Sequence, residues 1–200
     1  MFIMRKRKKA KRKSSLEERK SMNICIFGGA SDEVDARYIR ETEEGCRRLA
    51  QRGHTLIFGG GNGGMMGAAA RGFRAEGGKI VGVVPEFFHV DGVLFEQCTE
   101  FVYTHTMRER KQYMEEHSDL FLVMPGGVGT MDEFFESFTL YTLRCHRKPA
   151  VLMNLLGYYN RLLEFLKEMV TKGFLQQGKA EELYVAETFV NLLKIKGLNL

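Results

Sequence analysis

The sequence predicts an α/β protein: a single doubly wound, Rossmann-like parallel sheet with helices on both faces. Short, almost continuously apolar runs alternate with longer helical stretches along the chain. Such runs are typical of parallel strands that are buried on both faces. A length of 200 residues with 44% hydrophobic content suits one domain with a substantial core. Glycine-rich turns follow several of the apolar runs, as they do at the ligand-binding edge of such sheets.

Six apolar, β-rich runs are expected to form the strands. They are residues 23–27, 55–59, 79–84, 100–104, 119–124 and 149–153.

Helices are expected between most of these strands. Residues 35–53 read as a helix that ends at Gly53, and residues 65–78 as a short helix of small residues. Residues 129–145 carry apolar side chains at helical spacing. Two further helical stretches, 158–175 and 186–197, are expected to close the domain.

The net charge of +5 belongs to the N-terminal segment. Residues 1–13 contain eight Lys or Arg, whereas the remainder has 22 basic and 25 acidic residues. We therefore expect residues 1–21 to be a disordered basic extension and residues 22–200 to form one domain. We expect the extension to be a solvated tail, so a nucleic acid partner is not expected.

No apolar run approaches the roughly 18–20 residues that a membrane span needs, and no secretory signal is visible.

The four cysteines, Cys25, Cys46, Cys98 and Cys145, lie far apart. None forms a CxxC pair or a His/Cys spacing suited to a metal. This pattern predicts reduced thiols in a cytoplasmic protein and no metal site.

Three strand-to-helix turns are rich in glycine: residues 27–31, 58–67 and 125–130. Glycine lets the backbone approach a ligand closely, and free amides at a helix start bind anions. Three such turns favour a ligand that carries phosphate over glycines that only make tight turns. The second turn also matches a dinucleotide motif, Gly59-x-Gly61-x-x-Gly64, but it has Met65 where an ATP-binding loop needs lysine.

The third turn, "PGGVGTMDE", contains Thr130 and Glu133 at capping-box spacing. Glu133 could therefore cap its own helix. The upstream segment "THTMRERKQYM" places Arg108, Arg110 and Lys111 near the start of another helix, where the dipole disfavours cations. An anionic ligand opposite them would explain this pattern, and a solvated basic face is the alternative.

Together the segments "GGGNGGMMG", "MRERK" and "PGGVGTMDE" resemble the signatures of the Lonely Guy family. The resemblance extends from Asn23 through "HRKPAVLMN" and "GYYNRLL". These proteins are cytokinin riboside 5′-monophosphate phosphoribohydrolases, often labelled lysine decarboxylases. The resemblance implies hydrolysis of a nucleoside 5′-monophosphate to free base and ribose 5-phosphate, without a cofactor, by a homodimer or larger homo-oligomer. The decarboxylase label would require a pyridoxal phosphate lysine, for which the sequence offers no support.

By this resemblance, the family's conserved arginine falls on Arg110 and its catalytic glutamate on Glu133. A carboxylate near the sugar suits the reaction, because cleavage of the C1′–N bond develops positive charge on the ribose. The substrate-binding positions are expected at Glu100, Lys111, Gly60, Gly61, Gly126, Gly127, Val128, Gly129, Thr130 and Asp132.

The chain departs from the family pattern at several positions. Arg108 replaces a histidine, Asp132 replaces a glutamate, and Leu140 and Thr142 stand where a tryptophan and a glutamine are usual. The last two belong to a helix expected near the base, so an ordinary nucleotide such as AMP competes with a cytokinin nucleotide as substrate. Two other functions remain open: a non-catalytic carrier of a nucleotide or phosphorylated cofactor, and a dinucleotide oxidoreductase that uses the second glycine turn.

Overall fold

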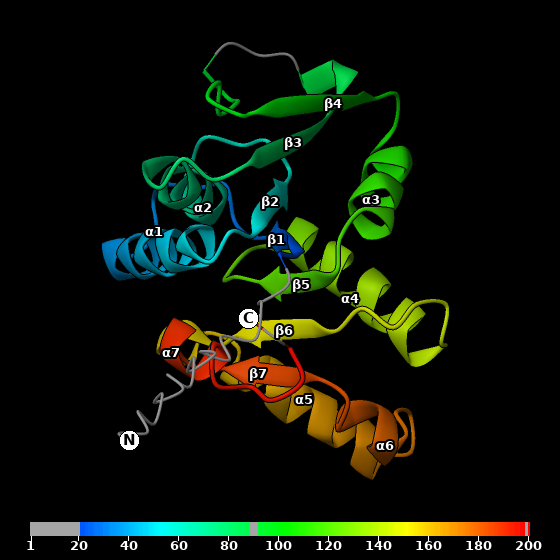
Figure 1. Cartoon of the computed structure of the whole chain (residues 1–200). Helices are drawn as coiled ribbons and strands as arrows, with labels where there is room; N and C mark the ends of the chain where they lie inside the picture. Colours follow the sequence, from blue (N-terminus) through cyan, green and yellow to red (C-terminus); the bar gives the residue numbers. More distant parts are fainter. Residues whose placement is uncertain (1–20, 89–91, 199) are drawn as a thin grey trace, which may run out of the picture.

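The computed structural model describes residues 21–88, 92–198 and 200 (Figure 1). Its centre is a seven-stranded, all-parallel sheet in the order β4-β3-β2-β1-β5-β6-β7. The strands are β1 (Asn23–Phe27), β2 (Thr55–Phe58), β3 (Ile80–Pro85), β4 (Glu100–Thr104), β5 (Leu120–Val123), β6 (Ala150–Met153) and β7 (Tyr184–Ala186).

Helices cover both faces of the sheet, as predicted. They are α1 (Ala36–Gln51), α2 (Gly64–Ala75), α3 (Met107–Glu116), α4 (Val128–Thr142), α5 (Asn160–Thr171), α6 (Gln177–Ala180) and α7 (Phe189–Leu192), with 3-10 turns η1 (Glu86–Phe88) and η2 (Leu155–Gly157). In Figure 1, α1, α2 and α7 lie on one side of the sheet, and α3, α4 and α5 lie on the other.

Alternate side chains of the strands build the two halves of the core. On β1, Ile24 and Ile26 pack toward α1, α2 and α7, whereas Cys25 and Phe27 pack toward α3 and α4. All four side chains are buried, because a parallel strand inside two helical layers meets no solvent on either face.

The chain path creates one switch point in the sheet. From β1 the chain moves outward through β2 and β3 to β4, then crosses back to β5 on the other side of β1 and continues to β6 and β7. Ligands of doubly wound sheets bind at the carboxyl ends of the strands where the order reverses. The three glycine-rich turns follow β1, β2 and β5, which are neighbours, so the fold gathers all three turns at this point.

Most predicted elements are found. The six predicted strands differ from the observed ones by at most one residue at either end. The predicted helices 158–175 and 186–197 are shortened to α5 and α7, and Ala186, the first residue of the second, ends strand β7 instead. Helix α1 ends as expected: Gly53, just beyond its last turn, has a φ of +80°. Strand β7 was not predicted, because three residues are too few for a periodic pattern. Its stability comes from pairing with β6, where Tyr184 lies opposite Val151 and Ala186 opposite Met153.

Residues 1–20, nearly all of the predicted basic extension, lie outside the described residues. Within the described part, all four cysteines are free thiols, and no helix is long and apolar enough to cross a bilayer.

Candidate active site at the carboxyl edge of the sheet

The turn between β5 and α4 leaves the start of α4 without a protein cap. The N-cap residue, Gly127, has no side chain to accept a hydrogen bond, and the first helical turn contains no acidic residue. By contrast, Asp35 caps α1 and Thr106 caps α3 through their side chains. A 15-residue helix with uncapped first amides and the positive end of its dipole is suited to an anion.

The predicted capping box of this helix is wrong. Thr130 is the third residue inside α4, not its N-cap, and its side chain is buried. It packs against Gly126, where a Cβ atom would lie only 2.1 Å from Thr130 Oγ1. Glu133 follows in the second turn of α4, too far along to reach back to the helix start. The alternative explanation of Glu133 as a capping residue is thereby removed.

Glu133 pairs instead with Arg110 of α3. Arg110 Nη1 donates to Glu133 Oε1 at 2.9 Å, and both side chains are only 10% exposed. Arg110 Nε also donates to the carbonyl of Val83, near the end of β3, at 3.2 Å. The guanidinium lies against the glycine turn after β2, because a Cβ atom on Gly59 would be 2.0 Å from Arg110 Nη2.

Burial is the main influence on the Glu133 carboxylate. It raises the pKa of Glu133 above its ordinary value, and the charge and hydrogen bond of Arg110 oppose this rise. The second carboxylate oxygen, Oε2, has no hydrogen bond to another described residue. Among the described residues, hydrogen bonding thus orients only one of the two carboxylate oxygens.

A cleft of about 400 Å³ opens beside this pair, over the ends of β2 and β3. Arg110 lines it, whereas Glu133 lies behind the guanidinium and borders a separate, much smaller cavity with Phe27 and Phe121. The cleft wall is mainly apolar, with Met66, Val84, Pro85, Phe88, Val93, Leu94 and Met107. Among the described residues, the polar side chains that line it besides Arg110 are those of Asp32 and Asn62.

Asp32 already occupies the start of α2. Its Oδ1 accepts a hydrogen bond from the Gly64 amide at 2.8 Å. The glycine turn after β2 therefore differs from the turn after β5: a protein carboxylate caps the first, and no side chain caps the second. Sequence reasoning missed Asp32, although its position just after the first glycine turn was a usable signal.

Lys111 and Asp132, both predicted to bind substrate, pair with each other on the shallow surface along α4 and do not line the cleft. Lys111 Nζ lies 2.9 Å from Asp132 Oδ2 and also contacts Glu136. The hydrogen bond to Glu136 is the main reason that the pKa of Lys111 is raised. Arg108 is exposed and forms no ion pair with the described residues, which fits the solvated basic face.

The remaining predicted residues are divided between the two edges of the sheet. Gly60 and Gly61 lie in the turn after β2, and Gly61 lines the cleft. Gly126, Gly127, Val128 and Gly129 lie at the turn into α4 and in its first turn, with the Val128 side chain exposed. Glu100 is the exception. It begins β4, so it lies at the amino edge, where it pairs with Lys79 at 3.3 Å. The structure therefore separates Glu100 from the site.

Leu140 and Thr142, expected near the base, do not line the cleft. Leu140 belongs to the outward face of α4, on a shallow surface with Lys111 and Phe135. The family resemblance had suggested that α4 borders the base, whereas the cleft described above is lined by residues of α2, β3 and the turns beside them.

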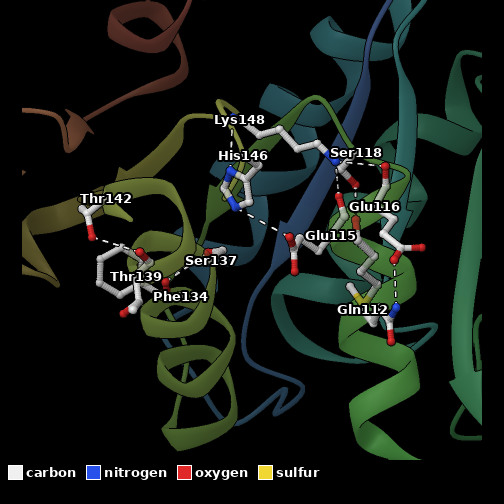
Figure 2. Close-up of polar contacts among 11 residues, drawn as sticks. Gln112, Glu115, Glu116, Ser118, Phe134, Ser137, Thr139, Thr142, His146 and Lys148 are labelled. Atoms are coloured by element: carbon white, nitrogen blue, oxygen red, sulfur yellow. Dashed lines mark hydrogen bonds and ion pairs between the residues drawn. The ribbon is translucent and has the colours of Figure 1, made fainter. Parts of the chain in front are cut away.

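A polar layer behind the site holds α3 in place (Figure 2). Lys148 Nζ donates to the carbonyls of Glu115 and Glu116, the last residues of α3. His146 from the same segment points toward Glu115, with its Nε2 3.9 Å from Glu115 Oε1. Burial lowers the pKa of His146, so this ring favours the neutral form. These contacts join the end of α3, the helix that carries Arg110, to the segment before β6.

The site does not fit pyridoxal phosphate. A lysine that forms a Schiff base needs an amine with a depressed pKa. Lys111, which borders Glu133, has its ammonium held by two carboxylates that raise its pKa.

The fold and the site define a doubly wound α/β protein with a candidate ligand site at its switch point. A family model described as "possible lysine decarboxylase" matches residues 66–195. The chain is 36% identical to the cytokinin riboside 5′-monophosphate phosphoribohydrolase of Mycobacterium tuberculosis over 171 residues. This alignment covers 86% of this chain and 91% of that protein. It is also 36% identical over 170 residues to a probable cytokinin riboside 5′-monophosphate phosphoribohydrolase of Oryza sativa subsp. japonica, covering 85% and 69% of the two chains. The chain belongs to the Lonely Guy family of these proteins.

Among solved structures, the molybdenum cofactor carrier protein of Chlamydomonas reinhardtii has the same fold. It superposes with a TM-score of 0.68 at 18% identity, over 87% of this chain and 94% of that one. At this identity the similarity concerns the fold alone.

Proposed function

We propose that this protein hydrolyses the N-glycosidic bond of a nucleoside 5′-monophosphate to free base and ribose 5-phosphate. The observation that carries the proposal is the buried Arg110–Glu133 pair, which lies between the uncapped start of α4 and the apolar cleft. The names of relatives at 36% identity support the same reaction.

In this proposal the phosphate accepts hydrogen bonds from the free amides of residues 126–130. Glu133 follows Val128 by five residues, or about 7.5 Å along the helix axis. That spacing suits a phosphate at the helix start with its ribose over the arginine–glutamate pair. The base then lies in the apolar cleft, whose wall suits a purine.

The chemical step follows from the two oxygens of Glu133. The Arg110-bound carboxylate offsets the positive charge that develops on the ribose as the C1′–N bond breaks. The free Oε2 accepts a proton from the attacking water, whose oxygen forms the new bond to C1′. The bonding electrons leave with the base, which then takes up a proton.

A non-catalytic carrier of phosphorylated ligands is the second candidate, because carrier proteins share this fold. An uncapped helix start would be enough to bind such ligands. The buried carboxylate favours the enzyme, since a buried charge costs several kcal/mol of desolvation and has no function in holding an anion.

The oxidoreductase is less well supported. Its pyrophosphate would have to bind at the start of α2, where the Asp32 carboxylate already accepts a hydrogen bond from the Gly64 amide. A second anion at that point would be repelled.

We also propose a homodimer in the cytoplasm. The outward face of α4 presents Phe135, Leu143 and the 88% exposed Val128 next to the shallow surface that contains Leu140. Sedimentation equilibrium would test the assembly, with Phe135→Glu and Leu143→Glu as variants expected to favour the monomer.

The test of function is a substrate panel: AMP, isopentenyl-AMP, adenosine and NAD, with free base measured by chromatography. We expect base release from at least one monophosphate, and a loss of at least 100-fold in Glu133→Gln with binding retained. Retained binding without release from any monophosphate would favour the carrier. Hydride transfer with NAD would favour the oxidoreductase.

A further inference from the structure

Two consecutive tyrosines hold the carbonyls of the turn between β5 and α4. Tyr159 Oη donates to the carbonyl of Met124 at 2.6 Å, and Tyr158 Oη donates to the carbonyl of Gly126 at 2.7 Å. Both tyrosines follow β6, the next strand of the sheet, and come from the "GYYN" segment just before α5.

The backbone before the tyrosines is specifically shaped. Leu156 and Gly157 have φ angles of 52° and 74°, in the left-handed region that a residue such as leucine rarely adopts. Asn154 accepts a hydrogen bond from the Tyr159 amide at 2.7 Å, which fixes the chain after this bend. The tight bend brings both hydroxyl groups to the neighbouring turn.

The Tyr158 ring is also packed from two sides. It meets Tyr38 of α1 and Tyr159 edge to face, with centroid distances of 6.1 and 4.9 Å. The side chain nevertheless remains 46% exposed, so its hydroxyl contributes little to the core.

The two hydrogen bonds have different consequences for the turn. In a trans peptide the C=O and the N–H point in opposite directions. Tyr159 holds the carbonyl of Met124, whose peptide partner is Pro125 and has no N–H. Tyr158 holds the carbonyl of Gly126, so the N–H of Gly127 must point away from Tyr158. Within residues 21–88 and 92–198, nothing accepts a hydrogen bond from that amide.

A peptide between two glycines would otherwise rotate with little steric hindrance. We propose that Tyr158 is a positioning residue: its hydroxyl presets the Gly126–Gly127 peptide so that the Gly127 amide faces the substrate phosphate. The inference rests on the proposed function only in placing the phosphate at this turn. Tyr158 touches the turn and not the substrate, so its effect passes through a single amide.

The experiment compares wild type with Tyr158→Phe, which keeps the ring and removes only the hydroxyl. A neutral hydrogen bond contributes about 1 kcal/mol, so we expect a roughly fivefold rise in KM for AMP and in the Kd of ribose 5-phosphate. We expect kcat, the Kd of adenosine, which lacks phosphate, and the melting temperature to stay close to their wild-type values.

A double-mutant cycle with Gly127→Pro isolates the mechanism, because proline removes the N–H that Tyr158 orients. In the Gly127→Pro background, Tyr158→Phe should have no further effect on ribose 5-phosphate binding. Equal losses for adenosine and ribose 5-phosphate, or additive effects in the cycle, would overturn the inference.

The outcomes also separate this inference from the proposed function. If wild type binds AMP but releases no base, the hydrolase proposal fails, while the Tyr158→Phe binding comparison still decides the inference. If wild type binds neither AMP nor ribose 5-phosphate, both are overturned.

Discussion

Arg110 and Glu133 form a buried ion pair that joins α3 to α4, with Nη1 and Oε1 2.9 Å apart. The same guanidinium donates from Nε to the Val83 carbonyl, so one side chain connects two helices and a strand. The glycine at position 59 makes room for it. The pair is therefore as much a feature of the fold as of the candidate active site, and stability and activity should respond together to its loss.

Removal of the arginine should destabilise the protein strongly. Arg110→Met leaves the buried Glu133 carboxylate without its cation, which we expect to cost about 3–5 kcal/mol of unfolding free energy near pH 7. Urea denaturation measures this loss. The deficit should shrink at low pH, where Glu133 takes up a proton. A variant within 1 kcal/mol of wild type near pH 7 would contradict the structural role of the pair.

Glycine at position 59 should be required mainly because it leaves room for the Arg110 guanidinium, and less because of the conformation of the turn after β2. In Gly59→Ala the new Cβ atom would collide with Arg110 Nη2, so the guanidinium must leave its position against Glu133. We expect base release to fall by at least tenfold, as measured by free base from AMP. Gly178→Ala is the matched control, because a Cβ atom there meets nothing within 4 Å. Equal activity of the two variants would show that Arg110 does not depend on Gly59.

Gly129 has no steric reason of its own to be glycine. A Cβ atom there meets nothing within 4 Å, and the residue lies in the first turn of α4. Gly129→Ala should therefore leave unfolding free energy unchanged or raise it by up to about 1 kcal/mol, since alanine favours the helix. If the phosphate approaches this turn, the added methyl group should weaken ribose 5-phosphate binding, which calorimetry measures. Unchanged binding would place the phosphate elsewhere.

Activity should depend on the ionisation of Glu133. Burial raises the pKa of this carboxyl above its ordinary value. The ionised form is the one that stabilises positive charge on the ribose, so kcat should fall as the pH drops through the raised pKa. The acid limb of the kcat profile should lie above the range of an ordinary glutamate and should be absent from the residual activity of Glu133→Gln. An acid limb that persists in that variant would assign it to another group.

The raised pKa of Glu133 also affects stability, but in the opposite direction: activity should increase as the pH rises, whereas this contribution to stability decreases. A raised pKa means that the folded protein binds the proton more tightly than the unfolded chain. The stabilisation from this proton is fully present below the ordinary pKa of glutamate and is lost as the pH rises through the raised value. Urea midpoints across this range should therefore vary less with pH in Glu133→Gln than in wild type. If the urea midpoints of wild type and Glu133→Gln changed with pH in the same way, the pKa of Glu133 would not be raised in the folded protein.

Lys148 should stabilise the protein through the end of α3. Its ammonium donates to two carbonyls of the last turn, those of Glu115 and Glu116. Lys148→Met leaves both without their donor, and we expect a loss of about 1–3 kcal/mol in unfolding free energy. The control is Lys172→Met, which removes only an exposed ion pair with Glu168 at the end of α5 and should cost at most about 0.5 kcal/mol. Equal effects of the two would show that the α3 contacts add nothing.

The sequence by itself determined the class of fold and the segments that meet at its switch point. Continuous apolar runs such as residues 119–124 cannot be amphipathic, so they required cover on both faces. The glycine turns after β1, β2 and β5 were readable because parallel topology sends every strand end to one edge. The family resemblance singled out Arg110 and Glu133. Their contact joins residues 23 positions apart and was not readable from local pattern.

Only the tertiary structure decided what each of these residues contacts. Thr130 and Glu133 had the spacing of a capping box, but α4 begins three residues earlier than that motif requires, and Glu133 turns to Arg110. Glu100 lies at the opposite edge because it begins its strand, not because its chemistry is unsuitable. Tyr158 reaches Gly126 only because β6 lies beside β5. Local pattern reports the periodicity and propensity of one segment, whereas contacts such as these arise from how the sheet orders its strands.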